Sequence, residues 1–270
     1  MFKIGFSAQY RNQTPMEKNT LSAESSSAVK SVVQVFFPER HMTLAYYNDR
    51  FNLRKGDLVY VDGKLEGLPG RVVDITYSFK IKLSDYKRVV GKVDVSVKGD
   101  LYCCGGHMLA FDRGVIPREK IISWYKGPCE EETVCGEGAD EEWFSLETME
   151  GFKVAPEIAE RGRDYFWSEN VEYIELDNGR GFAIVQGSKP YEVEFNYRDG
   201  KIGGIVCDCF CSYNCKHQVA ALLQLSSLIE DIKAHYSERY EGSGYFAAIN
   251  KIKLFDNVFN GEMQTKLTLC

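Results

Sequence analysis

The chain has 270 residues, of which 44% are apolar and 27% charged, as in soluble globular proteins of one or two domains. No apolar run reaches the roughly 18 residues that cross a bilayer, so the sequence predicts no membrane-spanning helix. The first residues lack the apolar segment of a secretion signal, and the nine cysteines are an odd number. We therefore expect a cytoplasmic protein whose reduced thiols are free to bind metal.

The net charge of −6 is distributed unevenly along the chain. Residues 30–126 hold 17 Lys and Arg against 11 Asp and Glu, whereas residues 127–150 hold none against nine. Residues 151–236 hold nine Lys and Arg against 13 Asp and Glu. The first part is basic and the rest is acidic, so the first part is the stronger candidate for contact with nucleic acid.

Residues 10–30 are polar, rich in serine and without periodicity, so residues 1–30 are predicted to be a flexible arm or linker that can begin with a short strand at Phe2–Gly5. From Ser31 short β-type segments follow one another, separated by Gly, Pro and Asn-Asp turn signals and with no helix between them. A helix is expected at 117–126, where Pro117 suits a helix start. The strand spacing suits a small antiparallel barrel or sandwich, and we predict a small, basic, antiparallel β-barrel domain over residues 31–126.

The Gly-, Pro- and Glu-rich stretch 127–150 predicts an acidic linker. A second domain, 151–236, begins with a helix after Pro156 and ends with a helix from 217 to 235. Between them lie four β-type segments joined by turn signals: NVEYIEL, RGFAIVQG, YEVEFNY and KIGGIVC. Residues 237–270 form a C-terminal extension. The predicted fold class is α+β, a small barrel followed by a β-meander, a metal-binding loop and a helix.

The segment CDCFCSYNCKH is the densest group of metal ligands in the chain. Cys207 and Cys209 form a C-x-C pair suited to a tight turn, and Cys215 and His217 form a C-x-H pair at a helix start. An alternative set replaces Cys207 by Cys211, which leaves only three residues between the two pairs. We prefer the first set because five intervening residues give the chain more room to turn around the ion.

This ligand set predicts one structural zinc ion. Three thiolates and one imidazole complete a tetrahedral site and leave no open position for water or substrate. The partial positive charge of the helix N-terminus, with Lys216 beside it, favours the thiolate form of Cys215.

The segment CDCFCSYNCKHQVAALLQL resembles the SWIM zinc finger, in which a C-x-C pair, a spacer and a C-x-H pair lead into a helix. The resemblance extends upstream over IAERGRDYF, NVEYIEL, FAIVQGSKPYEVEF and YRDGKIGGIVC, as in stand-alone bacterial members. The five-residue spacer is shorter than is usual in the family. The resemblance implies a structural zinc in a module that binds DNA or protein, found also in Swi/Snf-type ATPases and Mutator-type transposases.

No catalytic pattern accompanies the cluster. The chain lacks a phosphate-binding G-x-x-x-x-G-K-[ST] loop, a G-x-S-x-G elbow and an H-E-x-x-H pair. We therefore expect a binding protein rather than an enzyme, with no small-molecule substrate.

Two kinds of partner remain open. Interleaved cations and aromatic residues in the first domain suit binding of nucleic acid, although strand aromatics more often fill a core. The candidate cations are Arg54, Lys55, Lys80, Lys82, Lys87, Arg88, Lys92 and Lys98, and the aromatics are Tyr46, Tyr47, Phe51, Tyr60, Tyr77, Phe79 and Tyr86. The alternative is a protein adaptor that works in trans with a Swi/Snf-type ATPase, without touching nucleic acid.

Overall fold

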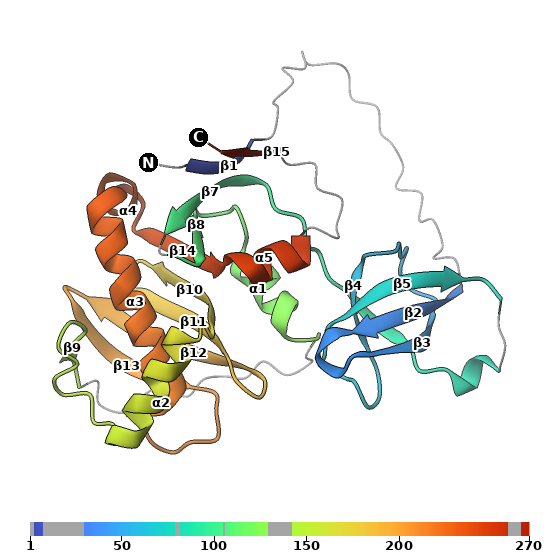
Figure 1. The fold of residues 1–270 in the computed structure, drawn as a ribbon, viewed down its shortest axis with the longest axis horizontal. Helices are drawn as coiled ribbons and strands as arrows, with labels where there is room; N and C mark the ends of the chain where they lie inside the picture. The colour runs from blue at the N-terminus through green and yellow to red at the C-terminus, as the bar shows by residue number, and fades with distance from the viewer. Residues whose placement is uncertain are drawn as a thin grey trace, which may run out of the picture.

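A computed structural model describes residues 3–7, 30–78, 82–104, 106–128, 142–258 and 266–269. The fold is mixed α+β and contains two antiparallel sheets, one of five strands and one of ten (Figure 1). Most of the predicted arm 1–30 and of the acidic linker 127–150 lies outside the described residues. Within the described parts, no helix is both long enough and apolar enough to cross a membrane.

The smaller sheet has the strand order β3-β2-β5-β4-β6. Its strands are β2 (Ser31–Phe37), β3 (Met42–Asn48), β4 (Leu58–Val61), β5 (Gly70–Thr76) and β6 (Val89–Lys92). Two 3-10 turns, η1 (Pro38–Arg40) and η2 (Leu83–Asp85), interrupt the chain between them. On its inner face β2 buries Val33, Val35 and Phe37 against Tyr46 of β3, as alternation along a strand requires.

The prediction of a closed barrel was wrong. The described residues give no ladder between the edge strands β3 and β6; one isolated parallel bridge joins Tyr47 of β3 to Arg88, just before β6, with the Tyr47 N–H donating to the Lys87 carbonyl over 2.8 Å. One bridge is not a ladder, so in the part of the chain that is described this sheet curls without closing.

The larger sheet has the order β15-β1-β7-β8-β14-β10-β11-β12-β13-β9. Its strands are β1 (Lys3–Ser7), β7 (Gly99–Cys104), β8 (Met108–Phe111), β9 (Phe144–Ser145), β10 (Val171–Asp177), β11 (Arg180–Gln186), β12 (Pro190–Arg198), β13 (Lys201–Cys207), β14 (Tyr245–Asn250) and β15 (Lys266–Leu269). The four segments predicted for the second domain form the consecutive meander β10 to β13.

Strands β7 and β8 were expected in the barrel, but they belong to the larger sheet. They pair with each other, and β8 pairs with β14, where Ala110 lies opposite Ala248. Leu101 and Phe111 thereby join an apolar cluster that also contains Tyr173 of β10. Pairing across more than a hundred residues leaves no local signal, which is why turn and strand patterns alone placed these strands wrongly.

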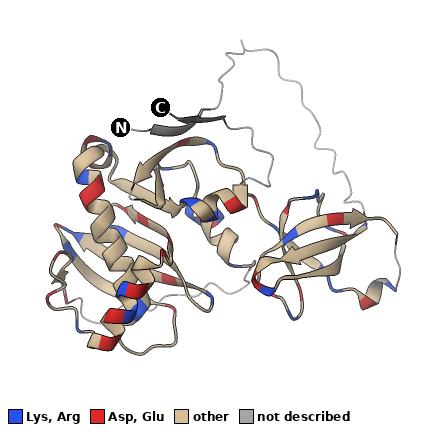
Figure 2. Cartoon of the chain, in the orientation of Figure 1, with Lys and Arg blue, Asp and Glu red and all other residues tan. Residues whose placement is uncertain are grey.

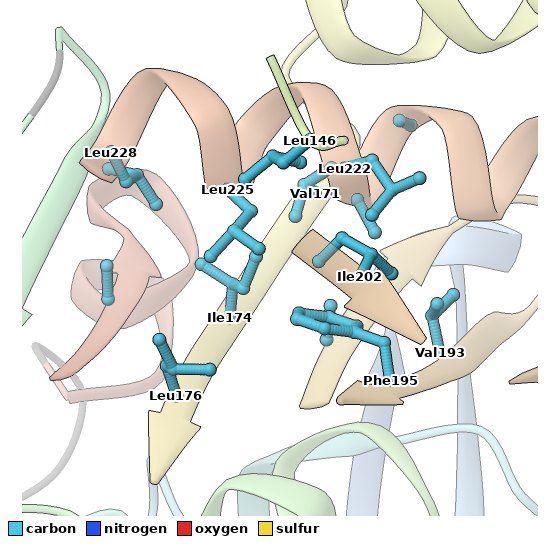
Figure 3. Packing of buried hydrophobic residues seen from close by; sticks show 14 of the residues in the cluster. Leu146, Val171, Ile174, Leu176, Val193, Phe195, Ile202, Leu222, Leu225 and Leu228 are labelled. Carbon is cyan, nitrogen blue, oxygen red and sulfur yellow. The ribbon is translucent and has the colours of Figure 1, made fainter. Parts of the chain in front are cut away.

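Helices cover both faces of the larger sheet. The helices are α1 (Arg118–Tyr125), α2 (Pro156–Trp167), α3 (Lys216–His235), α4 (Ser237–Ser243) and α5 (Lys251–Val258). On one face Leu222 and Leu225 of α3 pack on Ile174 of β10 (Figure 3). On the other face Trp124 of α1 packs in the cluster of Tyr173. Successive β10 residues thus serve opposite layers, as the two-residue period of a strand demands.

The small sheet is joined to this core through β4. Val59 and Val61 point into the small sheet's own cluster, whereas Leu58 and Tyr60 pack with Trp124 of α1. Helix α1, expected to close the barrel, is therefore shared between the two sheets.

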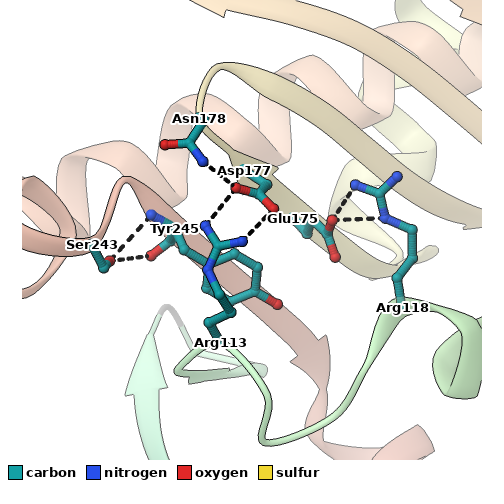
Figure 4. A network of polar contacts seen from close by, with 7 residues as sticks. All are labelled: Arg113, Arg118, Glu175, Asp177, Asn178, Ser243 and Tyr245. Atoms are coloured by element: carbon teal, nitrogen blue, oxygen red, sulfur yellow. Dashed lines mark hydrogen bonds and ion pairs between the residues drawn. The ribbon is translucent and has the colours of Figure 1, made fainter.

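A group of ion pairs ties the β8–α1 connection to β10 (Figure 4). Arg118 donates two N–H groups to one oxygen of Glu175, whose other oxygen accepts from the Tyr173 hydroxyl. Arg113 holds both oxygens of Asp177 at 2.6 and 2.7 Å. The Glu175 side chain is 4% exposed and that of Asp177 29%, so the first pair is the buried one.

Helices α2 and α3 contact each other closely at Gly162. Replacing Gly162 by alanine is expected to lower the free energy of unfolding by about 1–3 kcal/mol, because the new methyl group would lie 2.3 Å from Cβ of Val219. At an exposed helical position the same change stabilises by about 1 kcal/mol, so the sign of the effect reports the contact. Urea denaturation followed by circular dichroism measures it. Glu160→Ala, at an exposed position of the same helix, is the control, and a stabilised Gly162→Ala variant would contradict the packing.

Candidate metal centre

The connection from β13 to α3 brings four potential metal ligands together. Cys207 is the last residue of β13, Cys209 lies in the following loop, Cys215 is the N-cap of α3, and His217 is in its first turn. Their ligand atoms all lie within 4.8 Å of one another. The strand end and the helix start therefore each supply half of the set.

The distances fit a tetrahedral zinc site. Zinc–sulfur bonds of about 2.3 Å and zinc–nitrogen bonds of about 2.0–2.1 Å place neighbouring ligand atoms about 3.6–3.8 Å apart. Nδ1 of His217 lies 3.8 Å from Sγ of Cys207 and 3.7 Å from Sγ of Cys215. This donor set has the composition and spacing of a structural zinc site and offers the ion no open position.

Helix capping places Cys215 at the site. The Cys215 N–H donates to Oε1 of Gln218 over 2.7 Å, and the Cys215 sulfur accepts from the backbone of Gln218, which completes a capping box. Nε2 of Gln218 also donates to the Ile205 carbonyl of β13, over 3.3 Å. The same glutamine thus fixes the helix start relative to the strand that carries Cys207.

Two tyrosines orient the His217 ring. It stacks on Tyr191 with ring centroids 4.2 Å apart and meets the edge of Tyr165 at 5.6 Å. The side chain is buried, with Nδ1 towards the thiols, and its Nε2 has no hydrogen-bond partner among the described residues. Ring packing therefore selects Nδ1 as the ligand atom.

The three ligand thiols differ in pKa: one has a lowered pKa and two have raised pKa values. The pKa of Cys215 is lowered to about 4, first because the Cys207 thiol donates a hydrogen bond to it, and also by contacts with His217 and the Gln218 N–H, while burial opposes the shift. The pKa of Cys207 is raised, by donating that bond and by burial. Burial raises the pKa of Cys209 to about 11. One thiolate is thus stabilised, and a metal ion bound by this set would displace the protons of the other two thiols.

Cys211 is outside the group of four, which is the set preferred from the sequence. Its backbone hydrogen-bonds to the Cys209 thiol and lowers the pKa of that thiol against the effect of burial. Cys211 therefore influences the potential ligand Cys209 through a backbone hydrogen bond, not through its own thiol.

An aspartate that the sequence pattern did not single out anchors the loop. Oδ1 of Asp208 accepts the Glu192 N–H over 2.8 Å, and its Oδ2 lies 3.0 Å from Nζ of Lys126. Lys126 also pairs with the Glu192 carboxylate at 2.9 Å. Burial of the lysine opposes its charge, but these two carboxylates raise its pKa. An isolated Asp between two cysteines carries no signal of this role, because Lys126 is distant in the chain.

Replacing Asp208 by alanine is expected to weaken zinc affinity about tenfold, because the loop loses the two side-chain contacts of the aspartate and keeps only its backbone bond to the Glu192 carbonyl. Competition with a chromophoric chelator measures the affinity. Asp208→Asn keeps an acceptor for the Glu192 N–H and should lose less. Equal affinities for the wild type and the alanine variant would show that the loop holds its shape without these bonds.

The cations and aromatics of the small sheet do not form one exposed binding face. Tyr46, Tyr47 and Tyr60 are buried, while Tyr77 is 63% exposed. Charges of both signs alternate over the strands (Figure 2). Ion pairs among the described residues there include Lys55–Asp74, Arg88–Asp49 and Lys92–Asp57. Phe79 and Lys80 lie outside the described residues. Three of the rings predicted to stack on nucleic acid are therefore buried and cannot contact it in this fold.

The four side chains of the group lie together where strand β13 of the larger sheet leads into helix α3. It can hold one tetrahedral cation, and its ligands leave no coordination site for a reacting molecule. Comparisons with protein-family models, curated proteins and solved structures find no match to this chain.

Proposed function

We propose that the chain is a zinc-binding protein of the SWIM type, with one structural Zn²⁺ held by Cys207, Cys209, Cys215 and His217. The observation that carries the proposal is the group of four ligand atoms within 4.8 Å of one another at a strand–helix junction. The order of elements also supports it, since helix α2 and the meander β10 to β13 precede a C-x-C and C-x-H pair that enters α3.

The role of the metal follows from its place. Zinc at this point crosslinks the end of β13 to the start of α3 and fixes the loop between them. With four protein ligands it neither activates water nor polarises a substrate. The proposed protein is therefore a binding module without catalytic activity.

The proposed partners are a nucleic acid or a protein. A protein partner such as a Swi/Snf-type ATPase is favoured for the small sheet, because three of its cations are already paired with acids. Nucleic acid is favoured where cations are accompanied by accessible rings.

Metal analysis of the protein purified under reducing conditions tests the proposal. We expect about one zinc per chain, and a chelator should unfold the region of β13 and α3 before the small sheet, because metal binding contributes folding free energy there. Elemental analysis and hydrogen exchange with and without chelator are the measurements. A reduced preparation that contains no zinc and takes up none when it is added would refute the proposal.

A further inference from the structure

A pocket of about 340 Å³ opens beside the metal centre. Helix α2 forms one wall, and the β11–β12 turn and the loop after Cys209 form the others. The metal ligands Cys209, Cys215 and His217 lie at its base. The loop wall takes its shape from the metal site, so the pocket depends on the same residues as the proposed zinc.

Four aromatic rings line this pocket. Tyr165 and Tyr191 flank His217; Tyr165 is half-buried and Tyr191 is buried. Phe210 and Tyr213 stand on the loop and are 95% and 64% exposed. Phe210 lies between two cysteines at a position that contributes nothing to the core, so its exposed ring is available to a ligand.

Two cationic side chains, those of Arg161 and Lys216, line the pocket, and no Asp or Glu is among its described lining residues. The anionic group in the lining is the Cys215 thiolate, which we propose as a zinc ligand. The residues 151–236 that surround it carry nine cations against 13 acids. Nζ of Lys216 lies 4.1 Å from the centre of the Tyr165 ring and 2.6 Å from its hydroxyl. Arg161 forms no ion pair with any described residue, so its charge is free for a ligand.

We propose that this pocket binds a nucleotide unit of a single-stranded nucleic acid, an inference that rests on the proposed zinc module. Exposed rings stack on bases of any sequence, and cations beside them contact the phosphates. A volume of 340 Å³ suits one planar base with its sugar. A phosphorylated peptide is the poorer match, because phosphopeptide-binding sites are built from clustered arginines, whereas this pocket has one arginine and four aromatic rings. None of the described residues that line the pocket belongs to the small sheet, where the sequence pattern suggested nucleic-acid contact.

Fluorescence anisotropy with the full-length, zinc-loaded protein tests this. The probes are labelled single-stranded thymidine and uridine homopolymers, and the same thymidine strand in a duplex. We expect the single strands to bind more tightly than the duplex. Phe210→Ala and Tyr213→Ala should each weaken binding about tenfold, the effect of losing one stacked base. Arg161→Gln should reduce the slope of log affinity against log salt by about 0.7, the value for one phosphate contact on a single strand.

Matched controls come from the same chain. Trp167→Ala removes an aromatic ring that is 77% exposed but does not line the pocket, and Arg163→Gln removes an exposed arginine of α2 outside the pocket. Both controls should bind as the wild type does. If the zinc-loaded wild type binds neither homopolymer, the pocket assignment is wrong while the zinc proposal stands. The same conclusion follows if the Phe210 and Tyr213 variants bind the homopolymers as tightly as the wild type does. Zinc content measured on every sample separates that outcome from failure of the metal site itself.

Discussion

Replacing Cys215 by serine is expected to abolish zinc binding and to unfold the junction of β13 and α3. The change removes one thiolate of four, yet serine is a good N-cap, so the helix keeps its capping hydrogen bond. Any loss of stability in this variant therefore comes from the missing metal ligand and not from a missing helix cap. Structural zinc contributes about 10–16 kcal/mol of folding free energy in small modules, so its loss is expected to destabilise the junction strongly. Elemental analysis and thermal unfolding followed by circular dichroism measure both effects.

Cys211→Ser is the matched control for this result. It lies in the same loop, but its sulfur is outside the group of four and its backbone contact with Cys209 survives the change. We expect one zinc per chain and an unchanged midpoint of thermal unfolding. Cys207→Ser should behave like the Cys215 variant. The opposite pattern, with zinc lost in the Cys211 variant and kept in the Cys207 variant, would establish the alternative ligand set.

Replacing Arg118 by methionine is expected to lower the free energy of unfolding by about 3–5 kcal/mol, because a buried carboxylate loses its counter-charge. Glu175 is 4% exposed and depends on Arg118 and the Tyr173 hydroxyl. Methionine retains much of the apolar volume over the Phe182 ring, against which the guanidinium lies at 5.0 Å. Chemical denaturation measures the change.

The neighbouring pair provides the comparison. Arg113→Met breaks a pair of similar geometry with Asp177, but that carboxylate is 29% exposed and can be solvated. Its cost should be at most about 1 kcal/mol, as for pairs near the surface. Glu175→Gln in the Arg118→Met background should recover most of the lost stability. Equal costs for Arg113→Met and Arg118→Met would show that burial of Glu175 does not decide the effect.

Local patterns predicted the elements around the metal centre. Helix α2 begins at Pro156 as expected, and α3 begins one residue before its expected start at His217. The meander β10 to β13 follows the predicted segments, because turns and alternation act over a few residues. The ligands were also identifiable, since each C-x-C or C-x-H pair is local and only eleven residues contain both.

What the sequence by itself determined is thus the set of short-range features: the strand and helix segments, the cysteine pairs and the absence of a catalytic pattern. Only the tertiary structure decided which strands share a sheet, that the barrel stays open, and that Lys126 anchors the loop through Asp208. It also placed α2 and the Phe210 loop around one pocket that Arg161 and Lys216 line. These contacts join segments far apart in the chain, where complementary packing and charge decide between pairings that leave no periodic trace in the sequence.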